Sequence, residues 1–374
     1  MIVLPFSQTA RSPEDLVNVD ILPAITPELR RVAEEFSVAV TPAMVNLIDR
    51  DDPHDPIAAQ FIPSAAELNI LPGERPDPID DDAFSPVEGV VHRYPDRVLL
   101  KLLRTCAVYC RFCFRREQVG EAKAMLSGEA IDRALEYIRA HTEIWEVILS
   151  GGDPLVLSDR RLGDVIEKLN AISHVKVVRI HTRLPVVDPE RITPDLIAAL
   201  RGRAPVYVLL HCNHPRELTP EARAACALLV DAGFPMLSQS VLLRGVNDDA
   251  AVLAELMRAF VACRITPHYL HHGDLARGTS HFRVSVERGQ ELVRGLRGHL
   301  SGLCQPSYML DIPGGHGKVP ISSGFIQREG DVWSVEDYRG KRHIYCDANA
   351  DSPASLPSEN ETCEKSQAPA RAPS

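Results

Sequence analysis

Three cysteines in one short stretch are the clearest candidates for chemistry. Cys106, Cys110 and Cys113 have the spacing C-x3-C-x2-C in the segment RTCAVYCRFCFRRE. Three thiols are one fewer than the four ligands of a usual structural zinc site. A zinc ion would need a fourth ligand, for which His92 or Cys212 is a candidate. We favour an iron–sulfur cluster, with one iron left open for chemistry, over zinc and over three incidental thiols.

This cysteine spacing resembles that of radical S-adenosylmethionine enzymes. The resemblance implies a [4Fe–4S] cluster whose open iron binds the methionyl group of S-adenosylmethionine. The segment LSGGDPL supports this interpretation, because it follows an apolar run and glycines let the backbone approach a ligand closely. Alone it indicates only a turn with an N-cap, but after the cysteines it resembles the motif that holds the methionyl amino group. Its polar and small residues are Ser150, Gly151, Gly152 and Asp153.

A lysine in a glycine-rich segment, Lys318 in DIPGGHGK, is the second candidate. The segment does not match a phosphate-binding loop, because its glycines are too close together and Val319 follows the lysine. Such a segment also lets a lysine reach a carbonyl cofactor, as in pyridoxal-phosphate enzymes. Arg93 and Arg97 in VHRYPDRV would bind the phosphate of that cofactor, since guanidinium groups bind phosphate in a bidentate manner. Read separately, these residues indicate an exposed turn and a solvated face.

The set of motifs as a whole resembles the lysine 2,3-aminomutase family. The matching stretches run from about residue 50 to 325 and include HRYPDRVL, CAVYCRFCFRR, LSGGDPL, LPVVDPERIT, HCNHPREL, QSVLLRGVND, GTSHFRV and PGGHGK. The resemblance implies a partial (β/α)6-type barrel with a [4Fe–4S] cluster, S-adenosylmethionine and pyridoxal phosphate. It also implies roles by motif position: Lys318 for the covalent bond to pyridoxal phosphate, Arg93 and Arg97 for its phosphate, Arg115 for the substrate carboxylate, and His211 and Gln239 for the S-adenosylmethionine pocket.

Two acidic residues bear on the substrate. Asp274 in HHGDLARG and Asp311 in MLDIPGG follow predicted strands, and they match the family positions that bind the ε-ammonium group of lysine. Relatives that act on glutamate resemble this set but carry Lys and Asn instead. The resemblance therefore implies a 2,3-aminomutase that interconverts L-lysine and β-lysine by radical migration of the amino group. Arginine and ornithine remain alternatives, because a guanidinium group also pairs with carboxylates.

The elements that must position these residues begin at about residue 97, where apolar runs alternate with amphipathic stretches. Runs such as RVLLKLL, WEVILS and PVYVLLH predict strands, and RLGDVIEKLNAI and TPEARAACALLVDAG predict helices. Starts roughly thirty residues apart are typical of βαβ units and predict an α/β fold with a parallel sheet. Six or seven units fit a complete or partial barrel, with chemistry at the carboxyl ends of the strands. An open doubly wound sheet is an alternative that the periodicity leaves open.

Four parts are predicted along the chain. Residues 1–95 form a helical and strap region, in which Thr-Pro pairs begin two helices. Residues 96–325 form the barrel with the pyridoxal-phosphate site, and residues 326–346 form a C-terminal extension. Residues 347–374, rich in Ser, Pro, Ala and Glu, form a disordered tail.

Composition limits the partners. A net charge of −10 over 374 residues argues against nucleic acid. The sequence has no apolar run of about 18 residues, so no membrane span is expected. Nine cysteines without an export signal suggest thiols kept reduced in the cytoplasm. We expect a small amino-acid substrate and a reductant of the flavodoxin or ferredoxin type.

The sequence departs from the family pattern at two sites. Studied members hold a structural zinc between subunits through cysteines, but Asp249 stands at one of these positions and the C-terminal part has only Cys346 and Cys363. We therefore predict no zinc site, and a homo-oligomer, if formed, without a zinc bridge. His316 stands where a glycine is usual, and it either touches the cofactor or caps the loop. Two further alternatives are a non-catalytic metal-binding or electron-transfer barrel and a radical enzyme without pyridoxal phosphate.

Overall fold

The computed structural model describes residues 8–120, 125–330 and 332–345. The backbone divides into two compact units, Met1–Ser322 and Ser323–Ser374. The helical region and the predicted barrel belong to the first unit. The predicted disordered tail lies outside the described residues, so it stays a prediction.

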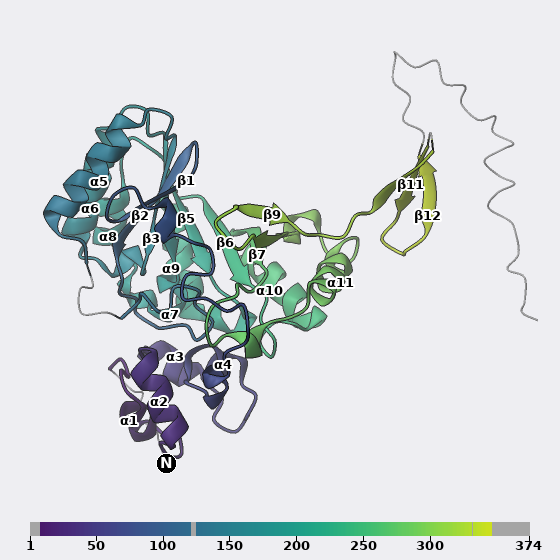
Figure 1. Cartoon of the computed structure of the whole chain (residues 1–374), viewed down its shortest axis with the longest axis horizontal. Helices are drawn as coiled ribbons and strands as arrows, with labels where there is room; N and C mark the ends of the chain where they lie inside the picture. The colour runs from purple at the N-terminus through teal and green to yellow at the C-terminus, as the bar shows by residue number, and fades with distance from the viewer. Residues whose placement is uncertain (1–7, 121–124, 331, 346–374) are drawn as a thin grey trace, which may run out of the picture. The chain divides into compact units, whose positions relative to one another are not determined.

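Short helices make up the N-terminal part of the first unit (Figure 1). The Thr-Pro rule holds for both helices predicted from it, because a proline occupies the first turn of each. The hydroxyl of Thr26 accepts a hydrogen bond from the backbone N–H of Leu29, as an N-cap should. The hydroxyl of Thr41 instead donates to the carbonyl of Val187 and ties this region to the barrel. The elements are α1 (Pro13–Asn18), α2 (Pro27–Glu35), α3 (Pro42–Leu47), α4 (Pro56–Phe61), η1 (Ala65–Leu68) and η2 (Asp82–Phe84).

A nine-stranded sheet dominates the first unit, and its strands are paired in chain order. Strands β2 to β8 are parallel, and β1 and β9 are antiparallel edge strands. The order never reverses, which excludes the doubly wound sheet. The strands are β1 (Val90–Tyr94), β2 (Arg97–Leu103), β3 (Glu146–Gly151), β4 (Val177–Thr182), β5 (Val206–His211), β6 (Met236–Val241), β7 (Thr266–His271), β8 (Ser307–Asp311) and β9 (Lys318–Pro320).

Six helical connections link the seven parallel strands, and they lie outside the curled sheet (Figure 1). The predicted partial (β/α)6-type barrel is therefore confirmed, with β8 added after the sixth unit. Within the described residues β1 and β9 do not pair with each other, so the barrel is open. The helices are α5 (Gly128–Ala140), α6 (Asp159–Asn170), α7 (Leu184–Val187), α8 (Pro194–Leu200), α9 (Pro220–Asp231), α10 (Ala250–Ala262) and α11 (Val286–Leu296). The 3₁₀ turns are η3 (Pro154–Val156), η4 (Pro189–Arg191), η5 (Pro215–Glu217), η6 (Ser280–Phe282) and η7 (Gly302–Cys304).

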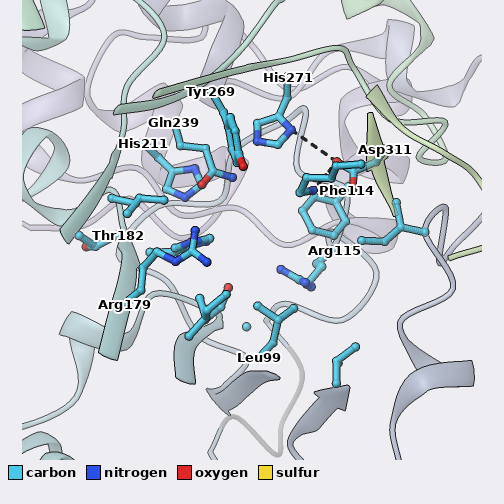
Figure 2. Close-up of a pocket in the computed structure, with 18 of the residues that line it drawn as sticks. Leu99, Phe114, Arg115, Arg179, Thr182, His211, Gln239, Tyr269, His271 and Asp311 are labelled. Carbon is cyan, nitrogen blue, oxygen red and sulfur yellow. Dashed lines mark hydrogen bonds and ion pairs between the residues drawn. The ribbon is translucent and has the colours of Figure 1, made fainter. Parts of the chain in front are cut away.

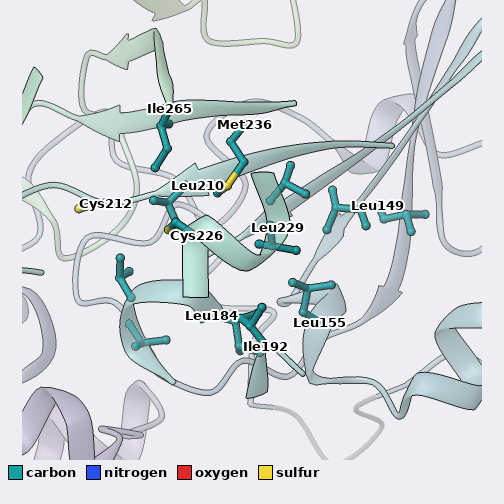
Figure 3. Packing of buried hydrophobic residues seen from close by; sticks show 14 of the residues in the cluster. Leu149, Leu155, Leu184, Ile192, Leu210, Cys212, Cys226, Leu229, Met236 and Ile265 are labelled. Atoms are coloured by element: carbon teal, nitrogen blue, oxygen red, sulfur yellow. The ribbon is translucent and has the colours of Figure 1, made fainter. Parts of the chain in front are cut away.

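The main core lies between the strands and the outer helices, as Figure 3 shows for Leu149, Leu210 and Leu229. Alternate residues of each strand point to opposite faces of the sheet. In β3, Val147 and Leu149 pack in this core, whereas Ile148 and Ser150 line a cavity on the inner face. The face of β3 toward the helices is thus apolar, whereas its inner face carries both an apolar and a polar side chain.

The second unit contains a three-stranded antiparallel sheet that the sequence did not predict: β10 (Ile326–Glu329), β11 (Val332–Glu336) and β12 (Arg342–Tyr345). Most of its side chains are exposed, and Ser334 is the buried exception among its described residues. No described helix combines the length and the apolar character that crossing a membrane would require.

Candidate active site

A cavity of about 700 Å³ occupies the inside of the barrel, and every residue that the sequence assigned to a cofactor or to the substrate lines it (Figure 2). These residues come from loops and strand ends that are far apart in the chain. They are Arg93, Arg97, Cys106, Cys110, Cys113, Arg115, Ser150, Gly151, Gly152, Asp153, His211, Gln239, Asp274, Asp311 and Lys318.

The cysteine loop follows β2 and is anchored on both sides. On one side, the backbone N–H of Arg111 donates to the carbonyl of Gln60 in α4. On the other side, Gly152 lies so close that a Cβ there would be 2.2 Å from the carbonyl oxygen of Thr105. Gly151 has φ +103°, a conformation that side-chain-bearing residues rarely adopt. The two glycines therefore allow the loop after β3 to pack directly against the cysteine loop.

The three thiols suit an iron cluster by their chemistry. Burial and the neighbouring charges of Asp153 and the other two thiols raise the pKa of Cys106 well above its ordinary value. Burial, followed by the charge of Cys110, raises the pKa of Cys113 to about 11. Three buried thiolates repel one another unless a cationic group binds them, and a cluster of iron ions supplies that charge.

The alternative zinc ligands lie elsewhere. His92 bonds to Tyr137 and Cys212 donates to the carbonyl of His214, and neither residue lines the cavity. Neither residue is therefore placed to complete a zinc site with the three cysteines.

Asp153 is buried and braces the loop after β3. Its carboxylate accepts hydrogen bonds from the Thr182 hydroxyl and from the backbone N–H groups of Leu155 and Arg183. These contacts hold the loop after β3 against the end of β4. The prediction that Asp153 accepts a hydrogen bond from a ligand ammonium group stays a prediction.

Lys318 begins β9 and faces Asp311 directly across the antiparallel hairpin, where the two residues are Cα partners. The Lys318 ammonium group donates to both carboxylate oxygens of Asp311. On the other side of Asp311, Nδ1 of His271 lies 3.4 Å from the carboxylate, as the dashed line in Figure 2 marks. Burial alone would raise the pKa of Asp311, but the contacts with His271 and Lys318 together lower it. Asp311 is therefore ionised and holds Lys318 in the cavity.

Asp274 is half-buried near the same group and holds its proton more tightly than Asp311 does. Burial, followed by the negative charge of Asp311, raises the pKa of Asp274 from 3.8 to about 7. Below about pH 7 the two carboxyl groups thus carry a single full charge, which the Lys318 ammonium group balances. A second cation entering the cavity would favour ionisation of Asp274.

Replacing Asp274 by Asn should stabilise the ligand-free protein at alkaline pH. Because the pKa of Asp274 is higher in the folded state, its contribution to stability falls as pH rises from 3.8 to about 7, and the loss is complete above that. Asn does not titrate. The free energy of unfolding of Asp274→Asn should therefore exceed that of the wild type only slightly at pH 4, and by up to about 4 kcal/mol at pH 8. Thermal melts at both pH values measure it. The exposed Asp51→Asn change should shift both melting temperatures equally, and an equal shift for Asp274→Asn would contradict the assignment.

Asp81 joins two of the predicted arginines. Its carboxylate lies 3.1 Å from Arg93 and 2.8 Å from Arg115, and its side chain is 1% exposed. Arg97 is more open, pairs with Asp96 at 2.6 Å and stacks on the ring of Tyr94. Asp81 therefore fixes Arg93 and Arg115 at the cavity wall before any ligand binds.

Several buried polar atoms at the cavity wall have no partner within the described part of the chain. They belong to Arg93, Arg179, His181, Arg183, Gln239 and His271. Unsatisfied buried polar groups are costly. Their concentration around one cavity fits a site built for polar ligands.

Sequence reasoning missed Asp81, Arg179, His181, Arg183 and His271. The segment HTRLP, which begins in the last two residues of β4, contains two of them, His181 and Arg183. Asp81 lies in the acidic run DPIDDDAF, which predicted an extended surface strap. Burial of that residue depends on its arginine partners, and no local pattern carries that information.

Comparison with known proteins identifies the family of this chain. The model of the Radical SAM superfamily matches residues 100–257. An L-lysine 2,3-aminomutase from Clostridium subterminale is 47% identical over 78% of this chain and 70% of its own length. The chain belongs to the lysine 2,3-aminomutase family. A second L-lysine 2,3-aminomutase, from Acetoanaerobium sticklandii, is 44% identical over 81% of this chain and 74% of its own length.

The chain is also similar to a relative that is named for a substrate other than lysine. A glutamate 2,3-aminomutase from Clostridioides difficile is 36% identical over 84% of this chain and 74% of its own length. Among solved structures, a radical SAM methyltransferase from Sphaerobacter thermophilus has a TM-score of 0.44 at 21% identity and covers 59% of this chain and 68% of its own length.

Membership in the lysine 2,3-aminomutase family implies a [4Fe–4S] cluster, S-adenosylmethionine and pyridoxal phosphate, and the cavity fits all three. Three thiols are available for the cluster, and the glycine segment after β3 adjoins them. Lys318 and the arginines supply an amine and cations for an aldehyde that carries a phosphate. The unpartnered polar atoms of His181 and Gln239 are available to the other polar groups of these cofactors.

The departures from the family pattern can also be located. Asp249 caps α10 by accepting hydrogen bonds from the backbone N–H groups of Ala251 and Val252. Cys346 and Cys363 lie outside the described residues, so the absence of zinc stays a prediction. The imidazole of His316 lies against Gly314 and does not line the cavity. That position favours the loop-capping alternative for His316.

Proposed function

We propose that this protein is a lysine 2,3-aminomutase that interconverts L-lysine and β-lysine. The observation that carries the proposal is a single cavity lined by the three cysteines, by Lys318 and by the carboxyl groups of Asp274 and Asp311. The named relatives at 44–47% identity support it. The reaction moves the amino group between neighbouring carbons and leaves the composition of the substrate unchanged.

Each group of residues has a separate task in this proposal. When bound, the cluster and S-adenosylmethionine supply a hydrogen-abstracting radical, and pyridoxal phosphate supplies a conjugated ring that stabilises the migrating group. Cys106, Cys110 and Cys113 hold the cluster. Lys318 would hold pyridoxal phosphate through Nζ, since it is the lysine that lines the described cavity. The barrel wall keeps water away from reactive species.

Charged side chains that line the cavity orient the substrate in this proposal. We assign Arg115 to the α-carboxylate and Arg93 and Arg97 to the cofactor phosphate, since all three line the cavity. Asp274 and Asp311 receive the ammonium group at the end of the substrate side chain. Departure of the Lys318 ammonium group from Asp311 frees a carboxylate that this second ammonium group can bind. The entering cation also favours loss of the proton from Asp274.

The substrate assignment can be tested with uncharged analogues. Under anaerobic conditions with dithionite, wild-type protein should convert L-lysine much faster than norleucine, which lacks the terminal amine. Asp274→Asn and Asp311→Asn should each lower kcat/KM for lysine about 100-fold or more, since a buried charge-assisted hydrogen bond is lost. The preference for lysine over norleucine should narrow in both variants. Mass spectrometry of the β-amino product gives the rates.

Matched measurements make this test decisive. The exposed Asp164→Asn change on α6 should leave the lysine rate unchanged. Arginine and ornithine should be assayed beside lysine, because they are the second candidate substrates and the two carboxyl groups also suit them. Faster turnover of either would move the assignment to that amino acid. Lysine turnover that survives both Asp→Asn changes would contradict the role of the acids.

The cluster also needs an external electron. We propose a one-electron carrier of the flavodoxin or ferredoxin type as the reductant and the cytoplasm as the compartment. The support is chemical, since reduction of such clusters requires a low potential and reduced thiols.

A further inference from the structure

The inner side of the cysteine loop faces one buried cation. Arg183, at the end of β4, directs one guanidinium nitrogen to Sγ of Cys110 at 3.0 Å. The Arg183 side chain is 7% exposed and lies over the rings of Phe61 and Phe112. A permanently charged donor thus points at one of the three predicted cluster ligands.

A second group of contacts fixes this guanidinium group through the nitrogen that does not face Cys110. Its other terminal nitrogen lies 2.6 Å from the carboxylate of Glu217, which is fully buried, and also contacts the Gln60 side chain. Glu217 in turn accepts hydrogen bonds from the Gln60 amide and from the backbone N–H groups of Asn213 and His214. The guanidinium therefore cannot easily turn away from the cysteine.

We propose that Arg183 is a positioning residue that sets the reduction potential of the cluster through a hydrogen bond to the Cys110 sulfur, with Glu217 as its counter-charge. Hydrogen bonds to cluster sulfurs withdraw negative charge from the iron and make reduction easier. The added electron comes from the external carrier and takes the oxidised cluster to its singly reduced form. The proposal rests on the proposed function, because it requires that the three cysteines hold a cluster.

Two variants of this ion pair should move the potential in opposite directions. Arg183→Lys removes the planar donor and should make the midpoint potential more negative. Glu217→Gln keeps the donor and removes the buried negative charge, so its midpoint should be less negative. A tenfold change in the ratio of reduced to oxidised cluster at a fixed potential corresponds to about 59 mV for one electron. Dithionite titration of the reconstituted protein, followed by electron paramagnetic resonance of the reduced cluster, measures the midpoint.

Opposite shifts separate this role from a purely structural one. Both substitutions disturb the same buried contact between Arg183 and Glu217, so a structural role predicts lower thermal stability in both and unchanged midpoints. That outcome would overturn the proposal. Arg191→Lys is the matched control, because Arg191 pairs with Asp159 at 2.6 Å and does not line the cavity. It should leave the midpoint as in the wild type.

A measurement on the wild-type protein tests the proposal even if the variants do not fold. Protein labelled with ¹⁵N in its arginines should show a hyperfine coupling between a guanidinium nitrogen and the reduced cluster, which Arg191→Lys retains. A wild-type cluster without that coupling would overturn the role of Arg183 and leave the proposed function intact. A wild-type protein that takes up no cluster would instead refute the proposed function.

Discussion

Replacing Cys110 by Ala should abolish both the cluster and the activity. A three-thiolate site that loses one ligand no longer binds a four-iron cluster firmly, and no other protein thiol among the described residues lines the cavity. Iron per protein after anaerobic reconstitution should fall to a small fraction of the wild-type value, together with the visible absorbance. Turnover of lysine should fall at least about 1,000-fold, since the radical is no longer generated.

Cys226→Ala provides the control for this experiment. Cys226 is a buried thiol on α9 within the main core and lies outside the cavity. It should retain full iron content, with a modest loss of stability from the small cavity it leaves. Wild-type iron content in Cys110→Ala would mean that another ligand completes the cluster. It would also remove the basis for the three-cysteine interpretation.

The second large effect concerns Lys318. Lys318→Ala should lose the covalent attachment of pyridoxal phosphate and reduce turnover below detection, because no other lysine lines the described cavity. Borohydride treatment followed by peptide mass spectrometry should place the label on Lys318 in the wild type and on no peptide in the variant. The iron content should remain normal, since Lys318 is separate from the cysteine loop.

Lys168→Ala tests whether the label is specific. Lys168 is exposed on α6 and pairs with Asp132, so its loss should alter neither labelling nor rate. A variant at Lys318 that keeps both its label and its turnover would show that the carbonyl cofactor binds elsewhere. Normal turnover without any label would favour the radical enzyme without pyridoxal phosphate.

The sequence predicted the barrel because its signals are local. The alternation of strands and helices is repeated, and the carboxyl ends of parallel strands meet at one edge. That rule brings Ser150, His211 and Asp311 toward one cavity although long stretches of chain separate them. The motifs indicate which chemistry the residues can perform, and the parallel topology predicts that these residues lie close together.

The missing parts of the site depend on contacts between distant segments. Arg183 meets Cys110 across 73 positions of the chain and Glu217 across 34. Asp81 stands in a run of acids that looks solvated until Arg93 and Arg115 are placed beside it. Whether a charged side chain is buried is decided by its partner in space. The strands of the second unit were missed because their side chains are mostly exposed and lack a clear apolar alternation.

The short hairpin from β8 to β9 has an evolutionary consequence. Asp311 and Lys318 are opposite each other in its register, so an insertion or deletion in the turn would displace the counter-ion and the amine together. The length of the turn therefore fixes the register of these two positions relative to each other. Asp274, on a separate loop, is free to vary without disturbing that register. A related protein that comes to prefer a substrate with a different group at the end of its side chain is therefore expected to change Asp274 first.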